Sequence, residues 1–215
     1  LIAGLLDLYE ARAEPRWLKE AQALQAVLDL RYADPAGGYF TTADDQEALL
    51  AREKPAQDGA EPSGNSVAVL SLLRLAELTT DDAYRARADR ALSAFGGILQ
   101  RAPAALSEML LALDYRLDRT LEVIVVLPEG DDDAEELLTP LRRMFVPSRV
   151  VAVVREGAEL TANAAAVPLL EGKRALDGKA TAYVCEQGLC RLPTSDAAEL
   201  RKQLGQVKSL DADGS

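Results

Sequence analysis

The sequence predicts a mainly α-helical chain that ends in a small α/β region. Two observations support this: apolar residues recur three and four positions apart over 1–120, and short β-branched runs begin at Leu121. With 215 residues, 48% of them apolar, the chain is long enough to bury a hydrophobic core. We predict helical hairpins over 1–120, a small α/β region over 121–208 and a disordered tail over 209–215.

The helical part begins with two amphipathic segments on either side of Pro15, a residue that suits a first helical turn. Their apolar faces contain Leu5, Leu8 and Tyr9 in the first segment, and Trp17, Ala21, Leu24 and Leu28 in the second. A long irregular section follows over about 32–62. Three more helices are predicted over about 64–78, 81–97 and 103–118.

The helical part contains an internal repeat with an offset of about 67 residues. At this offset Trp17 aligns with Tyr84 and Leu28 aligns with Phe95. The repeated unit is a helix, a short turn and a second helix with an early aromatic residue. Such hairpins build solenoids or closed α/α toroids. The alternative is a chance match between helices rich in leucine and alanine.

The α/β region contains three short, β-branched runs that predict strands over 122–127, 149–154 and 180–185. Helices are predicted between the first two strands, over about 133–145, and near the end, over about 195–206. A strand, a helix and a strand of these lengths form a βαβ unit. The first two strands are therefore predicted to be parallel.

The composition excludes several classes of function. A net charge of −11 and a pI near 4.6 disfavour nucleic acids and anionic membranes as partners. No apolar run approaches the roughly 20 residues that span a bilayer. Histidine is absent, and two cysteines cannot complete a zinc site, so we expect no metal and no cofactor. The low cysteine content favours a cytoplasmic location.

The strongest candidate site is the polar segment 54–66, which precedes a strongly apolar helix. Asp58 and Glu61 form a close acid pair among glycines and prolines, and two carboxylates in different surroundings can act as acid and base. They are the predicted catalytic residues. The alternative is structural: both acids cap backbone amides, and Lys54 pairs with one of them.

Four further residues are candidates for substrate binding: Tyr39, Lys54, Ser63 and Asn65. Ser63 and Asn65 can bind sugar hydroxyls or cap the helix that follows. The stretch 37–40, Gly-Gly-Tyr-Phe, offers close backbone approach and an aromatic face for a sugar ring. Its alternative is a turn with both aromatic side chains tucked beneath the loop.

Cys185 and Cys190 are separated by four residues at the end of the third predicted strand. This spacing differs from the C-x-x-C of thioredoxin-type redox pairs. Two reduced thiols, or a hairpin that brings the cysteines together, are the simpler interpretations. A switchable disulfide is the third, which makes these residues a candidate redox pair.

Three motifs occur in a characteristic order: Gly37-Gly38-Tyr39-Phe40, the segment Lys54 to Ser66, and Ala182-Tyr183-Val184-Cys185 with Cys190 and Pro193. Together they resemble the C-terminal third of the thioredoxin-domain proteins typified by spermatogenesis-associated protein 20. The resemblance spans most of the chain.

The resemblance implies a longer protein, with an N-terminal thioredoxin-like domain followed by an (α/α)6 toroid. That toroid is similar to six-hairpin glycosidases and to N-acylglucosamine 2-epimerase. The present chain would hold the last hairpins, hence a partial toroid, and the α/β region. Because the chain starts within a helix at Leu1, without Met, we expect it to be a piece of the longer protein. Those epimerases use histidines, which are absent here, so Asp58 and Glu61 are the remaining acid/base candidates.

Two functions follow as hypotheses. The first is carbohydrate binding or processing at segment 54–66, with a carbohydrate or another small molecule as ligand. The second is a non-catalytic helical scaffold for a thioredoxin-like redox domain elsewhere in the protein. A partial toroid leaves apolar helix faces uncovered, so residues 1–30 are expected to contact the missing N-terminal part or a second chain.

Overall fold

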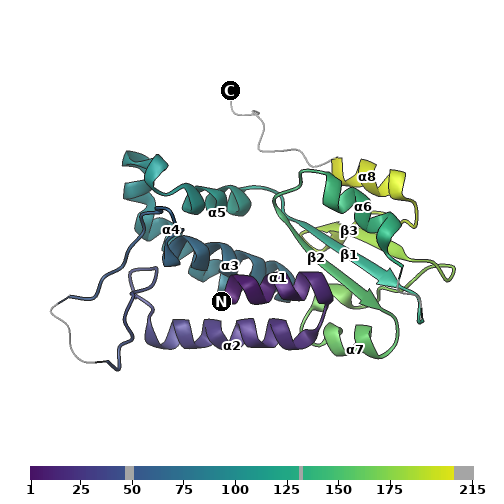
Figure 1. Ribbon diagram of the computed structural model, residues 1–215, viewed down its shortest axis with the longest axis horizontal. Helices are drawn as coiled ribbons and strands as arrows, with labels where there is room; N and C mark the ends of the chain where they lie inside the picture. Colours follow the sequence, from purple (N-terminus) through teal and green to yellow (C-terminus); the bar gives the residue numbers. More distant parts are fainter. Residues whose placement is uncertain (47–50, 131–132, 206–215) are drawn as a thin grey trace. The chain divides into compact units, whose positions relative to one another are not determined.

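The computed structural model describes residues 1–46, 51–130 and 133–205 (Figure 1). The chain forms two compact units. Unit 1 comprises Leu1–Leu6, Trp17–Ala76 and Asp81–Arg116; unit 2 comprises Asp7–Arg16, Glu77–Thr80 and the chain from Leu117 onward. Among the described residues, no helix has the length and apolar character needed to cross a membrane.

The predicted helices of the first part of the chain are confirmed. They are α1 (Ile2–Arg12), α2 (Pro15–Arg31), α3 (Gly64–Thr79), α4 (Asp82–Arg101) and α5 (Ser107–Leu117), with a 3-10 turn, η1, at Pro103–Ala105. Asp81 caps α4, because its side chain accepts the Ala83 N–H at 2.9 Å. As predicted, residues 32–62 contain neither an α-helix nor a strand in their described part.

The core of unit 1 is built from one face of each of α3, α4 and α5. Leu72 and Leu73 of α3, Phe95 of α4 and Met109 of α5 are all buried in the same cluster. Tyr39, from the irregular section, is buried there too. The irregular section is therefore anchored in the helical core.

Unit 2 contains the predicted sheet (Figure 1). Its elements are β1 (Leu121–Leu127), α6 (Glu135–Arg143), β2 (Arg149–Arg155), α7 (Ala158–Ala164), the 3-10 turn η2 (Pro168–Leu170), β3 (Thr181–Glu186), β4 (Leu189–Cys190) and α8 (Ala197–Gly205). The strand order is β2-β1-β3-β4. The predicted parallel pair β1 and β2 is confirmed, whereas β3 runs antiparallel to β1.

The centre of the sheet is β1, whose seven residues are all buried. Helices α6 and α8 contact each other and cover one face, where Val123 and Val125 pack with Leu137 of α6 and Leu200 of α8. The edge strand β2 differs, because its residues alternate between buried and half-buried. The half-buried residues are the odd-numbered ones, from Arg149 to Arg155.

The two helices predicted over about 133–145 and 195–206 are present but slightly shorter, as α6 and α8. Helix α6 begins at Glu135, where the Asp133 carboxylate accepts the Glu135 N–H at 2.9 Å. Short elements α7 and β4 were not predicted, because seven and two residues carry too little periodicity. The predicted tail, 209–215, lies outside the described residues.

Candidate functional site

The predicted catalytic residue Asp58 lies in the loop before α3. Its carboxylate accepts hydrogen bonds from backbone amides. The Ser63 N–H donates to Asp58 Oδ1 at 2.7 Å. The Glu108 and Met109 N–H groups donate to Oδ2 at 2.9 and 3.4 Å. Both donors belong to the first turn of α5, whose free N–H groups need acceptors. Asp58 therefore ties the start of α3 to the start of α5.

These contacts also set the ionisation of Asp58. Partial burial acts to raise the pKa of its carboxyl, but hydrogen bonds from Ser63, Ser66 and the α5 amides act in the opposite direction and prevail. The pKa therefore lies below its usual value of 3.8. At neutral pH the carboxylate is ionised and engaged.

Asn65 is buried and bridges two segments of backbone. Its Oδ1 accepts the Tyr39 N–H at 2.7 Å, and its Nδ2 donates to the carbonyls of Tyr39 and Pro55 at 3.0 and 2.7 Å. Gly38 allows this approach, since a Cβ there would lie 3.0 Å from Asn65 Oδ1 and 2.9 Å from the Phe95 ring. The side-chain amide of Asn65 therefore bonds to both the N–H and the C=O of Tyr39, as a neighbouring strand would.

Lys54 is the second connection between the same two segments. Its Nζ donates to Asp34 Oδ2 at 2.6 Å and to the Gly37 carbonyl at 2.8 Å. Gly37 has φ +103°, and a Cβ there would lie only 2.3 Å from the Arg90 carbonyl oxygen. The stretch Gly37-Gly38 is thus required for close packing against α4.

The Tyr39 side chain points into the protein. Its hydroxyl donates to Asp29 Oδ1 at 2.6 Å and accepts from Gln25 Nε2 at 2.9 Å. Arg87 forms an ion pair with the same Asp29 at 3.2 Å. Burial and the neighbouring carboxylate raise the Tyr39 pKa, so the phenol stays neutral. The ring, 7% exposed, contributes to the core.

The remaining predicted residues are Ser63 and Glu61. Ser63 is buried; its Oγ accepts the Ser66 N–H at 3.1 Å and so caps the first turn of α3. Glu61 is exposed, and its side chain has no hydrogen bond or ion pair with the residues the structure describes. Of the two predicted acids, one is fully engaged and the other faces solvent.

The structure thus places five predicted residues in one region, which we call the clasp: residues 34–40 and 54–66. Lys54 and Asn65 join the two segments, whereas Asp58 bonds to Ser63 and to α5. Sequence reasoning missed Gln25, Asp29 and Asp34 as partners in this region. Asp34 carried a signal, because Asp-Pro-Ala-Gly at 34–37 is typical of a turn. Its side chain accepts the Ala36 N–H at 2.8 Å, as an Asx turn does.

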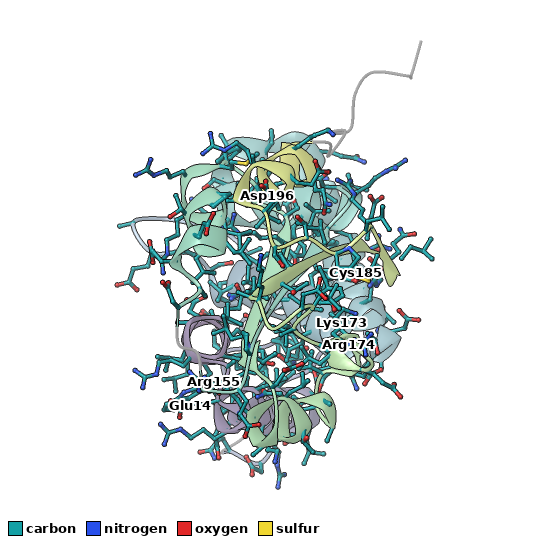
Figure 2. All side chains as sticks on the ribbon, turned by 90° about the vertical axis from the view of Figure 1, so that its right-hand side faces the viewer. Glu14, Arg155, Lys173, Arg174, Cys185 and Asp196 are labelled. Atoms are coloured by element: carbon teal, nitrogen blue, oxygen red, sulfur yellow. A yellow bond between two sulfur atoms is a disulfide. The ribbon has the colours of Figure 1, made fainter. Side chains whose placement is uncertain are left out.

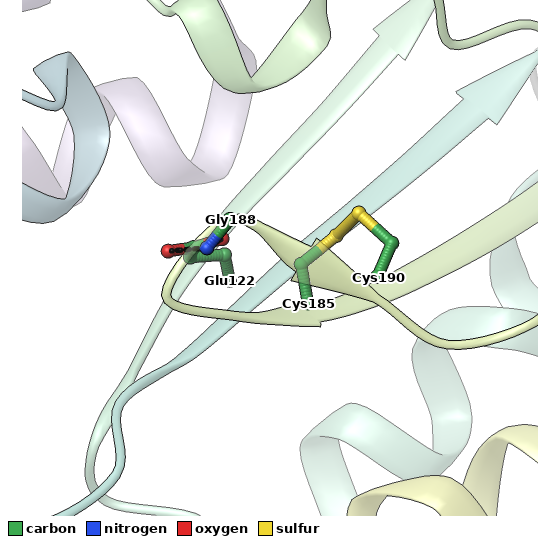
Figure 3. The surroundings of a disulfide bond; sticks show 4 residues. All are labelled: Glu122, Cys185, Gly188 and Cys190. Carbon is green, nitrogen blue, oxygen red and sulfur yellow. Dashed lines mark hydrogen bonds between the residues drawn. A yellow bond between two sulfur atoms is a disulfide. The ribbon is translucent and has the colours of Figure 1, made fainter.

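The cysteines of unit 2 form a disulfide, Cys185–Cys190, across the hairpin of β3 and β4 (Figure 3). Gln187 and Gly188 both have positive φ, as a two-residue hairpin turn requires. The Gly188 N–H points to the buried Glu122 carboxylate, with both oxygens at 3.3 Å. No cluster of three or more His, Cys, Asp or Glu suited to a metal ion occurs among the described residues.

Comparisons with known proteins identify relatives along nearly the whole chain. The chain is 36% identical to human spermatogenesis-associated protein 20 over 206 residues, which are 95% of this chain and 26% of that protein. The mouse and rat proteins of that name are each 35% identical over 208 residues, 96% of this chain. No protein-family profile matches.

The chain is homologous to part of spermatogenesis-associated protein 20. The resemblance predicted from the three motifs is therefore confirmed. The chain spans about a quarter of the length of spermatogenesis-associated protein 20, with 26% of each relative covered. Because the match extends over 95% of this chain, both units lie within the region shared with spermatogenesis-associated protein 20.

Proposed function

We propose that this chain is a non-catalytic helical scaffold within a longer protein related to spermatogenesis-associated protein 20, and that the clasp is structural. One observation carries the proposal: the Asp58 carboxylate, the best acid/base candidate, accepts backbone N–H groups of Ser63, Glu108 and Met109. It caps the first turn of α5 and holds Ser63, the residue that caps α3.

A general acid or base must reach the proton that it transfers. Asp58 would have to release two helix starts before it could meet a substrate. Its lowered pKa also makes it a weak base and leaves it without a proton to donate at neutral pH. Glu61 is exposed, and its side chain has no hydrogen bond or ion pair with a described residue that would hold it in place. These properties support the scaffold over carbohydrate processing.

The architecture is part of the same proposal. We infer that the hairpins of unit 1 contribute to an (α/α)6 toroid, with the missing helices and a thioredoxin-like redox domain in the remainder of the full-length protein. Helix α2 supports this inference, because Leu24, Val27 and Leu30 are exposed along one face at 36%, 51% and 70%. That face would pack against the missing N-terminal part or a second chain.

The two functions can be separated with one pair of variants. Asp58→Asn keeps the shape but places an amide NH2 or a weaker acceptor opposite the backbone donors. The scaffold predicts that this variant loses about 2 kcal/mol of unfolding free energy in urea. The matched variant Glu61→Gln is expected to stay within about 0.5 kcal/mol of the parent.

Both variants and the parent chain would also be titrated against a panel of mono- and disaccharides by calorimetry. The scaffold predicts no saturable heat for any of the three. A sugar that binds the parent, and is lost in Asp58→Asn or Glu61→Gln while folding is intact, would overturn the proposal in favour of carbohydrate handling.

A further inference from the structure

The edge of the sheet in unit 2 has hydrogen-bonding groups that nothing in the described chain satisfies. The Leu121 N–H donates to the Ser148 carbonyl, and the Glu156 N–H donates to the Leu127 carbonyl. In a parallel ladder, these two bonds fix which residues of β2 face β1. They are the even-numbered residues, so the N–H and C=O groups of the odd-numbered residues point away from β1.

The two ends of this edge are already closed. The Arg149 N–H donates to the Pro147 carbonyl at 3.1 Å, and the Arg155 N–H donates to Glu159 Oε1 at 3.3 Å. Between them, the outward N–H and C=O groups of Val151 and Val153 have no hydrogen bond to any described residue. They form a row of alternating donors and acceptors.

A cavity of about 660 Å³ lies beside this row, wholly within unit 2. Its larger apolar lining residues are Val151 and Val153 of β2, Leu138 and Leu141 of α6, and Leu127 of β1. Its volume is within the range that holds a short peptide or another drug-sized ligand.

Charged side chains surround the cavity, and most of them are paired. Glu14 and Arg155 both line it and are labelled on the same side of the molecule in Figure 2. Arg155 pairs with Glu159 at 3.0 Å, and Glu14 pairs with Arg12 at 3.2 Å. The exception is Arg149, which is half-buried and has no ion pair or side-chain hydrogen bond with a described residue.

The lining arginine on α6 is paired as well, since Arg142 contacts Glu135 at 2.6 Å. The cavity therefore offers three unmet features in one place: a strand edge, an apolar floor and the guanidinium of Arg149. A compact small molecule can meet the last two. Only an extended backbone also matches the repeat of the strand edge, about 6.6 Å between successive outward residues.

We propose that the open edge of β2 binds an extended peptide segment as an added strand, with a carboxylate side chain of that segment against Arg149. Main-chain hydrogen bonds to Val151 and Val153 would supply affinity, and alternate side chains would enter the cavity. The proposal is independent of whether the clasp is catalytic or structural.

A second copy of this chain fits the edge less well. The sequence of β2, Arg-Val-Val-Ala-Val-Val-Arg, reads the same in both directions. Antiparallel self-pairing centred on Ala152 would place Arg149 opposite Arg155 of the second copy. Like charges directly opposite each other destabilise a ladder, and charged residues at an edge discourage self-association.

The test uses acetylated, amidated five-residue peptides as probes, with Val or Thr at the outer positions and Glu, Gln or Lys at the centre. Each is titrated into the full 215-residue chain while amide hydrogen exchange is followed by NMR. We expect the Glu peptide to slow exchange at Val151 and Val153. Its affinity should exceed that of the Lys peptide by about tenfold, as a charge-assisted hydrogen bond would give.

Two controls separate strand addition from simple filling of the cavity. Val151→Pro removes an outward N–H but none of the bonds to β1, so the β1–β2 pairing should persist, at some loss of packing by the Val151 side chain, while peptide affinity falls about tenfold. Independently of any variant, a Glu peptide N-methylated on its edge-facing amides should bind at least tenfold more weakly. Arg149→Gln should remove the preference for Glu over Gln.

The contrary results are equally specific. The proposal is overturned if no probe slows exchange at the two valines at millimolar concentration, or if N-methylation leaves affinity unchanged. It is also overturned if sedimentation shows a dimer of the parent chain that Val151→Pro dissociates, because the occupant is then a second copy.

Discussion

The clasp of unit 1 and the β2 edge of unit 2 use their polar groups in opposite ways. In the clasp, the polar side chains of Lys54, Asp58 and Asn65 each have two or more partners within the protein. At the β2 edge, the backbone of Val151 and Val153 and the side chain of Arg149 have none among the described residues. A dense polar motif can therefore be a structural connection, whereas a run of valines can carry the unpaired backbone groups that are available to bind a partner.

The largest effect is expected when the clasp is broken at its tightest contact. Gly37→Ala places a Cβ 2.3 Å from the Arg90 carbonyl oxygen at a residue with φ +103°, so α4 or the loop must move. We expect a loss of about 3 kcal/mol in the free energy of unfolding, measured by urea titration.

The matched control is Gly59→Ala, in the same clasp. A Cβ at Gly59 would meet no atom within 4 Å, and its φ is not positive. Its unfolding free energy should equal or slightly exceed that of the parent. Equal losses in the two alanine variants would show that the clasp does not depend on the close approach of residue 37.

A smaller effect is expected from the disulfide in unit 2. Opening Cys185–Cys190 frees a loop of six residues in the unfolded chain, which corresponds to about 2 kcal/mol by loop-closure entropy. Thiol titration in denaturant should find no free thiol without reductant and two after reduction. In the folded chain, reduction should leave the NMR signals of the unit 1 helices unchanged.

This measurement also bears on location and on the predicted redox role. Disulfides persist in oxidising compartments and are rare in the cytosol. Two free thiols in chain purified without reductant would show that Cys185 and Cys190 are reduced, and would contradict the bond in the structure.

The sequence-based predictions succeeded where the signal was local. Helical periodicity located α2 to α5, and β-branched runs located β1 to β3. The parallel pairing of β1 and β2 followed from the length of the connection. Pairings between distant residues could not be predicted in this way: Asp58 meets the amide of Glu108, 50 residues later, and Asn65 meets the backbone of Tyr39.

The candidate site illustrates the same limit. The residues named from sequence do converge on one region, because Gly37 and Gly38 allow close packing. Whether their polar groups face a ligand or each other depends on tertiary contacts with α2 and α5, which single-sequence patterns do not contain. The β2 edge was missed for a related reason, since an open edge is visible only once the strand order is known.

The smallest predicted effect concerns pH. Because the folded pKa of Asp58 lies below its unfolded value, the carboxylate stabilises the protein above the unfolded pKa, near 3.8. This contribution is lost as pH falls through the still lower folded pKa. Asp58→Asn should therefore flatten the acid branch of the stability curve, measured as the urea midpoint at a series of pH values.

The most direct measurement of the central claim is the pKa of Asp58 itself, from an NMR titration of its carboxyl carbon in the folded chain. If the carboxylate is held by the amides of Ser63 and of the first turn of α5, the pKa will lie below 3.8. A pKa raised toward neutrality would contradict the account, because it would describe a carboxyl that is free of those amides and able to transfer protons.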